Sequence, residues 1–81
     1  MKISHLKDTD KTIGAKQTLK AIRRGDVSYV FIGSDSDGWV SEPIISLCEE
    51  LCIPYDVAHD MEALGRACHI KVKAAAVGVL R

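Results

Sequence analysis

The stretch "IGAKQTLKAIRRGDVSYVFI", residues 13–32, contains the pattern that decides the fold. Lys16–Arg24 is predicted to be a helix with Leu19 and Ile22 on one side, and Gly25 supplies its stop signal. Ser28–Ile32 is a short apolar run rich in β-forming residues, which predicts a buried strand. A helix that leads directly into a buried strand is typical of a layered α/β domain.

The rest of the chain continues this alternation of strands and helices. We expect strands at Lys11–Ile13, Ile53–Val57 and Ala74–Leu80, helices at Val40–Leu51 and Met61–Cys68, a loop at 33–38, and a loop or the entry to a strand at 69–73. Pro43 is expected in the first turn of its helix, and Asp60 as the N-cap of the next. The pattern predicts one α/β domain over residues 1–81, with a mostly parallel or mixed sheet and its ligand-facing loops along one edge.

Length and composition exclude several classes of protein. Eighty-one residues are enough for one domain with a modest core. The start, "MKISHLKDTD", has no apolar segment of the kind found in signal peptides, and no apolar run has the length of a bilayer span. The three cysteines are expected to be free thiols in a reducing cytoplasm. We therefore expect a cytoplasmic protein without a membrane partner.

The charges are segregated along a chain that is formally neutral. Residues 1–27 hold seven Lys/Arg and three Asp/Glu, residues 28–65 hold eight Asp/Glu and no Lys or Arg, and residues 66–81 hold four Lys/Arg and no acid. A fold that brings the two ends together would have a basic pole and an acidic flank, with a local field that the net charge hides.

The first candidate site is the helix start at Gly14–Lys20. Glycine lets the backbone approach a ligand closely, and the N–H groups of a first helical turn bind anions. Lys16 and Lys20 lie one turn apart on one face, and Gln17 can bond a base edge. Basic residues at a helix N-terminus are mildly unfavourable in the free protein, and a polyanion would offset that cost. A solvated surface helix explains the same residues.

The second candidate is "LGRACHIKVKAAA", residues 64–76. Its cations, Arg66, His69, Lys71 and Lys73, alternate with apolar Ile70 and Val72. Such a loop can cover an unstacked base while its cations contact phosphates. An edge strand with the two apolar residues pointing inward fits the pattern equally well.

Other polar groups do not form a catalytic or metal site by sequence. Asp35 and Asp37 follow a buried strand, as in aspartate-based phosphoryl transfer, but the chain has no partner motif for that chemistry. Cys48, Cys52 and Cys68 include no CxxC pair, and packed thiols explain them. We expect no enzyme, no metal and no cofactor.

Two motifs together resemble a known family. "IGAKQTLKAIRRG" followed about fifty residues later by "LGRACHIKVKAAAVGV" is similar to the L7Ae/L30e ribosomal protein family, in particular its small bacterial L7Ae-like members. The middle segment "SLCEELCIPY" also matches. The resemblance implies a three-layer α/β/α sandwich with a mixed four-stranded sheet. It also implies binding to kink-turn RNA, a sharply bent duplex with tandem sheared G·A pairs and an unstacked nucleotide.

The resemblance also assigns roles to individual residues. Gly14 would permit close approach of the RNA, Lys16 and Gln17 would reach guanine edges, and Lys20 would contact the backbone or a base. The later loop would cover the extruded nucleotide with Ile70, Lys71 and Val72, beside Lys73 and Ala74.

Three positions depart from the family pattern. His69 stands where many members have glycine, Lys71 where many have glutamate, and Asp37-Gly38 where many have Asp-Pro. These changes put the loop shape and the choice of unstacked base in question. The main hypothesis is a monomeric kink-turn RNA-binding protein that could associate with the ribosome, and the alternative is a protein-interaction module of the same fold.

Overall fold

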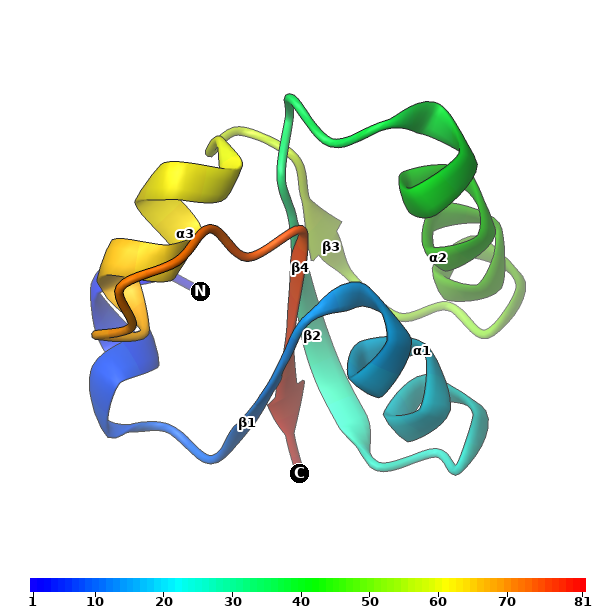
Figure 1. Ribbon diagram of the computed structural model, residues 1–81. Helices are drawn as coiled ribbons and strands as arrows, with labels where there is room; N and C mark the ends of the chain where they lie inside the picture. The colour runs from blue at the N-terminus through cyan, green and yellow to red at the C-terminus, as the bar shows by residue number, and fades with distance from the viewer.

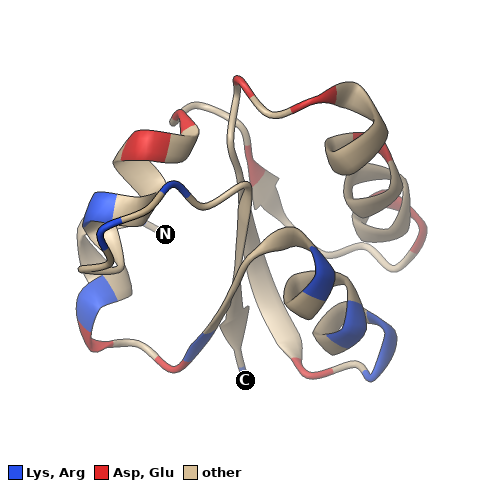
Figure 2. Cartoon of the chain, viewed as in Figure 1, with Lys and Arg blue, Asp and Glu red and all other residues tan.

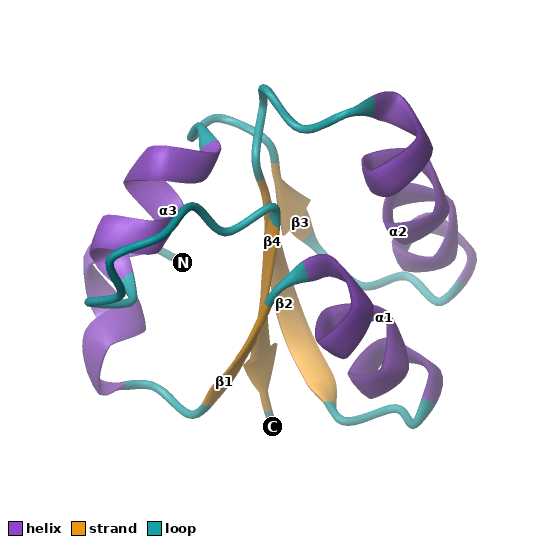
Figure 3. Cartoon of the chain, viewed as in Figure 1, coloured by secondary structure: helices purple, strands orange, loops and turns teal.

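The computed structural model describes residues 1–81 as three layers (Figure 1). Helices α1 and α2 cover one face of a four-stranded sheet, and helix α3 with the 3₁₀ helix η1 covers the other (Figure 3). This is the predicted α/β/α sandwich. The elements in chain order are η1 (Ile3–Asp8), β1 (Lys11–Ile13), α1 (Ala15–Arg23), β2 (Val27–Ile32), α2 (Gly38–Glu50), β3 (Tyr55–Asp56), α3 (Met61–Ala67) and β4 (Ala76–Leu80).

The strand order places four connections at one edge of the sheet. The order is β1-β4-β2-β3, with β2 parallel to β3 and β4 antiparallel to both β1 and β2. Strands β1, β2 and β3 therefore end where β4 begins. The connection at Gly14 and the loops 33–37, 57–60 and 68–75 all lie at this edge, which we call the loop edge. The prediction of loops along one edge is confirmed.

A bulge in β2 shifts the alternation by which the strand supplies both cores. Val27 is opposite Leu80 and Tyr29 is opposite Val79, so Ser28 is an extra residue without a partner on β4. The extra residue lets Val27 and Val30 face the same side, although they are three positions apart. Both are fully buried against α1 and α2, while Phe31 packs in the second core under α3 and η1.

Small residues on β4 set the position of α1. A Cβ added at Gly78 would lie 2.7 Å from the Thr12 Oγ1 and 3.2 Å from the Thr18 Cγ2. The hydroxyl of Thr18, which is fully buried on α1, is 3.0 Å from the hydroxyl of Thr12 on β1. This contact fixes the rotation of α1 about its axis. As a result Ala21 and Ile22 face the core, and the opposite face of the helix is exposed.

Most expected boundaries differ from the structure by one or two residues, and the largest differences are at α2, β3 and β4, which begins at Ala76 rather than Ala74. Helix α2 begins at Gly38 rather than Val40, because the Asp37 carbonyl accepts the N–H groups of Val40 and Ser41 at 2.9 and 3.0 Å. Pro43 is consequently the sixth helical residue and lies beyond the first turn. The strand expected at Ile53–Val57 is reduced to Tyr55–Asp56, since it is an edge strand that pairs only with β2. The 3₁₀ helix η1 had no counterpart in the prediction.

All three α-helices end in the same hydrogen-bonded pattern. In α1 the Asp26 N–H donates to the Ala21 carbonyl and the Gly25 N–H to the Ile22 carbonyl, both at 3.0 Å. This is a Schellman motif, which needs a left-handed residue at Gly25, where φ is +76°. The corresponding residues after α2 and α3 are Cys52, with φ +57°, and His69, with φ +58°. None of the helices has the length and apolar composition required to cross a membrane.

Candidate nucleic-acid interface

Helix α1 begins without a capping side chain and without an acid. Its N-cap is Gly14, whose φ of +104° is a conformation that side-chain-bearing residues rarely adopt. No atom lies within 4 Å of a Cβ added there, so this side of the backbone is open. The N–H groups of a first turn have no intrahelical acceptor, and here no side chain supplies one. Lys16, Gln17 and Lys20 are all exposed beside this open turn.

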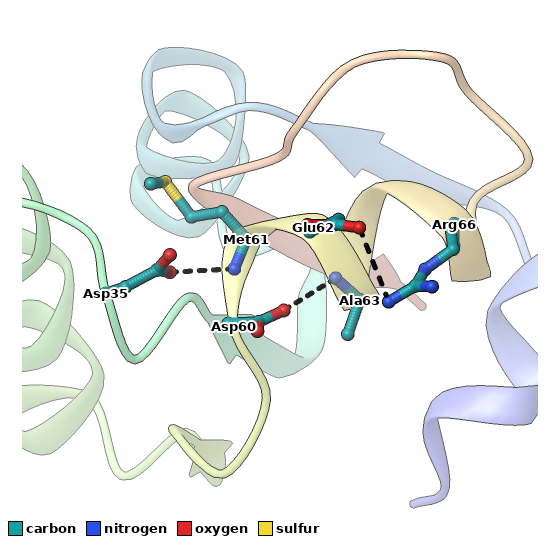
Figure 4. Close-up of polar contacts among 6 residues, drawn as sticks. All are labelled: Asp35, Asp60, Met61, Glu62, Ala63 and Arg66. Carbon is teal, nitrogen blue, oxygen red and sulfur yellow. Dashed lines mark hydrogen bonds and ion pairs between the residues drawn. The ribbon is translucent and has the colours of Figure 1, made fainter.

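The start of α3 is the opposite case. The Met61 N–H donates to Asp35 Oδ1 and the Ala63 N–H to Asp60 Oδ1, each at 2.8 Å (Figure 4). Glu62 adds a third carboxylate in the same turn. Asp35 is therefore a helix cap in the structure, and the predicted capping by Asp60 is confirmed. Among the helix starts at the loop edge, α1 is the one with neither an acidic N-cap nor an acid in its first turn.

The loop 69–73 is held against α3 (Figure 1). The Ile70 N–H donates to the Gly65 carbonyl at 3.1 Å, and the Ala74 N–H donates to the Met61 carbonyl at 3.1 Å. A Cβ at Gly65 would collide with the Val72 carbonyl oxygen, so this close approach requires glycine. The segment is thus a loop and not an edge strand. Its hydrogen bonds to α3 fix the backbone from which its side chains project.

The side chains of this loop divide between core and solvent. Ile70 is half-buried and packs against the core under α3. Val72 is 70% exposed, and Lys71 and Lys73 are also exposed. Only one of the two apolar residues therefore points inward. The loop presents one apolar side chain between two cations.

His69 has a structural explanation. It occupies the left-handed position of the Schellman motif that ends α3, with its N–H donating to the Arg66 carbonyl at 3.0 Å. Glycine is the usual residue at such a position because it has no Cβ. The backbone keeps the left-handed turn with histidine in place.

A hollow of about 470 Å³ lies between the loop and α3. Its charged lining includes Glu62 and Arg66, whose Oε1 and Nη2 atoms are 3.8 Å apart (Figure 4). Arg66 was part of the predicted segment, whereas Glu62 was not predicted to belong to the site. Their i, i+4 spacing on a helix was the available signal. The hollow thus offers a carboxylate and a guanidinium beside Ile70 and Val72.

Main-chain hydrogen bonds join the two predicted segments at the loop edge. The Gly14 N–H donates to the Ala76 carbonyl and the Gly33 N–H to the Ala75 carbonyl, both at 2.8 Å. The start of α1 therefore lies beside the first residue of β4, into which the loop 69–73 leads, although the two are far apart in sequence. The side chains of α1 lie on one face of the sheet, and those of the loop lie on the other, over α3.

The charge distribution follows this arrangement (Figure 2). Lys and Arg predominate on α1 and in the loop after α3, whereas Asp and Glu occupy α2, the loop before it and the start of α3. The 3₁₀ helix η1 and the segment after it carry both signs, with Lys7, Asp8 and Asp10. The ion pairs in the structure are Arg24–Asp26 and Arg66–Glu62. The four lysines at positions 16, 20, 71 and 73 have no carboxylate within 4.0 Å. Their charges are free to attract an anion.

Four groups have a raised pKa, and three of them lie outside the candidate segments. Burial raises the pKa of the Cys48 thiol, with a smaller contribution from Glu49, and burial raises the pKa of the Cys68 thiol against the opposing effect of Lys11. A hydrogen bond to Glu49 raises the pKa of Tyr55, and burial raises the pKa of Tyr29. All four are neutral near pH 7. Cys68 is the one that belongs to a candidate segment, where it directly precedes the loop 69–73, and its thiol is buried.

One exposed residue near α1 was missed by the sequence analysis. Trp39 is the second residue of α2, is 78% exposed, and lines a groove that it shares with Lys16 and Leu19. It lies off the apolar stripe of its helix and shares its face with Glu42 and Pro43. A tryptophan on the polar face of a helix was the signal that could have identified it.

The fold and these two segments define a small α/β/α protein. Its exposed lysines have no carboxylate partner, so they form a cationic surface that suits a polyanion. The chain belongs to the ribosomal protein L7Ae/L30e/S12e/Gadd45 family, whose model matches residues 2–81. It is similar to the RNA-binding protein YbxF of Geobacillus stearothermophilus, with 38% identity over 69 residues, covering 85% of this chain and 84% of that protein. An RNA-binding protein of Caldanaerobacter subterraneus subsp. tengcongensis is 42% identical over 65 residues, covering 80% and 79%.

Solved structures share the fold. A 15.5 kD RNA-binding protein of Giardia lamblia superposes with a TM-score of 0.86 and 27% identity, covering 98% of this chain and 68% of that one. A protein of unknown function from Bacillus halodurans has a TM-score of 0.88 and 25% identity, covering 98% and 83%. Membership of this family agrees with the prediction that the chain is not an enzyme.

Proposed function

We propose that this protein binds RNA and recognises kink-turns, using the start of α1 together with the loop 69–73. The observation that carries the proposal is the Gly14–Ala76 hydrogen bond of 2.8 Å, because it ties the uncapped helix start to the first residue of β4, into which the basic loop leads. The family match and the relatives named as RNA-binding proteins support an RNA ligand.

The start of α1 would enter the groove at the tandem G·A pairs. Gly14 leaves the backbone open to close approach, and the first-turn N–H groups point toward the incoming anion. Lys16 can donate to guanine O6 and N7, and Gln17 can bond a base edge. Lys20, one turn further along the same exposed face, would contact the phosphate backbone or a base.

The loop would cover the extruded nucleotide. Val72 supplies an exposed apolar contact and Lys71 and Lys73 flank it with charge. Ile70 anchors the loop in the core, so the contact surface is preformed. Because Lys71 replaces an acid common in the family, we expect it to strengthen phosphate attraction rather than to accept a hydrogen bond from the base.

The mechanism is stabilisation of the bent RNA. A protein that contacts only the bent state shifts the RNA population toward it by its differential affinity for the two states. We propose that it does so as a cytoplasmic monomer, in keeping with its three free cysteines. Ribosomal RNA is one structured RNA that could carry the motif. Cosedimentation with ribosomal subunits tests whether the protein binds ribosomal RNA.

The decisive experiment is a titration against two RNAs. One carries the kink-turn and the other has its G·A pairs replaced by Watson–Crick pairs. We expect markedly tighter binding to the first, and equal affinity would contradict the proposal. If the purified protein binds neither RNA but captures a protein, the interaction-module alternative replaces RNA recognition.

A further inference from the structure

A shallow groove separates the starts of α1 and α2 on one face of the sheet. It encloses about 240 Å³, with Lys16 and Leu19 on the α1 side and Trp39, Val40 and Pro43 on the α2 side. Lys16 is the one charged residue in its lining. The groove is therefore an apolar slot with a cation at one lip, directly beside the open turn at Gly14.

The side chain of Trp39 is not part of either hydrophobic core. It is 78% exposed and packs in neither hydrophobic cluster, whereas Ile44 and Cys48 bury the inner face of α2. Pro43 lies one turn after Trp39 and has no N–H, so it cannot donate to the Trp39 carbonyl as a helical residue would. The groove thus offers a large exposed aromatic side chain, on a turn whose Trp39 carbonyl lacks its usual helical donor.

We propose that an unpaired nucleobase of the bound RNA occupies this groove, stacked on Trp39, with its phosphate toward Lys16. The proposal rests on the RNA binding proposed above. Stacking on exposed aromatic side chains is how proteins hold unpaired bases, and it tolerates any base because each has a π-face.

Charge favours this orientation. The acids near the groove, Asp37 and Glu42, are on the α2 side, whereas α1 carries Lys16 and Lys20 and has no acid. A phosphate would be repelled from α2 and attracted to α1, while a neutral ring can lie between them. The groove is also continuous with the start of α1, since Lys16 belongs to both. One RNA could therefore contact both without a gap.

The fluorescence of Trp39 reports whether a base occupies the groove, because Trp39 is the single tryptophan of the chain. The probe is a kink-turn RNA with short unpaired extensions on both stems, titrated into wild-type protein while tryptophan emission is recorded. We expect strong quenching of emission and a lower acrylamide quenching constant in the complex, because a stacked base shields the indole. Saturated binding with unchanged emission and acrylamide access would overturn the inference.

Substitutions test how much Trp39 contributes to the affinity for this RNA. Trp39→Ala should weaken binding of this RNA about tenfold, and Trp39→Phe should keep most of the affinity. Leu51→Ala is the matched control, because Leu51 is a half-exposed apolar residue at the far end of the same helix. Equal affinity of the Trp39→Ala protein and wild type would count against stacking. Circular dichroism checks the fold, and the wild-type quenching experiment does not depend on the variants.

The outcomes separate this inference from the proposed function. Discrimination between the kink-turn and its Watson–Crick variant without any change at Trp39 refutes the groove proposal alone. Quenching by the extended RNA without such discrimination refutes kink-turn recognition alone. A dimer in sedimentation that Trp39→Ala abolishes would show that a second copy of the chain fills the groove, and would overturn the assignment to a base.

Discussion

At the scale of single residues, each α-helix is followed by a residue with a left-handed backbone, and these residues differ in the energetic cost of that conformation. Gly25, Cys52 and His69 fill equivalent places in three Schellman motifs, and only the first is glycine. A left-handed backbone costs a side-chain-bearing residue roughly 1–2 kcal/mol. The turn into the loop 69–73 is therefore held in place by its surroundings despite local strain.

Replacing His69 by glycine should relieve this strain. We expect His69→Gly to raise the free energy of unfolding by about 1 kcal/mol, after allowing for the extra entropy of glycine in the unfolded chain. Urea denaturation followed by circular dichroism measures the change. Gly25→Ala is the reciprocal variant, and it should lower the free energy of unfolding by about 1 kcal/mol, since open space around its Cβ leaves only the backbone cost. A loss of stability in His69→Gly would contradict the argument.

The three thiols should react at different rates. Cys52 is exposed, whereas Cys48 and Cys68 are buried and burial raises the pKa of both thiols. The thiolate is the reactive form, so a raised pKa and poor access both slow the reaction. With an aromatic disulfide reagent at pH 8 we expect one fast equivalent and two slow ones. Cys52→Ser should remove the fast phase, and three equal rates would show that the core is not closed as described.

At the scale of elements, the loop 69–73 depends on glycine in α3. Gly65→Ala would place a methyl group against the Val72 carbonyl, so the loop must move away from the helix. Overpacking of this kind costs about 1–3 kcal/mol. We expect that loss of stability in denaturation, together with weaker kink-turn binding. Gly38→Ala is the control, because its Cβ would lie 3.8 Å from Glu42 Oε1 in ordinary contact.

The start of α1 should carry the specificity. Lys16→Ala and Gln17→Ala should each reduce discrimination between the kink-turn and its Watson–Crick variant, by about 1–3 kcal/mol for a good base contact. Arg81→Ala is the comparison, because β4 ends at the opposite edge of the sheet and the Arg81 Nε donates to the Val27 carbonyl there at 3.4 Å. Titrations with both RNAs measure the three variants. An equal loss of discrimination in Arg81→Ala would contradict the assignment of specificity to the start of α1.

Local signals in the sequence predicted most elements, and the misses have physical causes. Lys11–Ile13 and the Asp60 cap are confirmed because their signals are local: a β-rich run and an oxygen acceptor three residues before a free N–H. The start of α2 was wrong, since Asp37 accepts the first-turn N–H groups through its carbonyl, which every residue has. The length of β3 depends on pairing with β2, a long-range contact that its own residues do not encode.

The candidate site was predictable in part for the same reason. Gly14, Lys16 and Gln17 are neighbours in the chain, so their shared surface follows from a helix alone. The groove at Trp39 exists only because α1 and α2 pack side by side, and the cap from Asp35 to Met61 joins loops 26 positions apart. Such contacts appear only when the sheet order is known.

At the scale of the whole molecule, the segregation of charge decides how binding responds to salt. The chain is formally neutral, so net charge alone predicts almost no electrostatic attraction to RNA. The structure instead gathers unpaired lysines on α1 and on the loop after α3, whereas α2 carries acids and no Lys or Arg (Figure 2). Phosphates that contact these lysines release counterions, and each contact contributes about 0.7–0.9 to the negative slope of log affinity against log salt.

We therefore expect a negative slope that corresponds to a few phosphate contacts, measured by titrating the kink-turn RNA at several salt concentrations. Lys20→Ala and Lys73→Ala should each lower the slope by up to about 0.9, because each removes at most one contact. Lys7→Ala, an exposed cation on η1 outside both segments, should leave it unchanged. If Lys7→Ala lowers the slope as much as Lys73→Ala does, the RNA extends over η1, and the interface is wider than the loop edge. A flat response in wild type would leave the exposed lysines without a role in binding, because free surface charges in contact with RNA cannot be insensitive to salt.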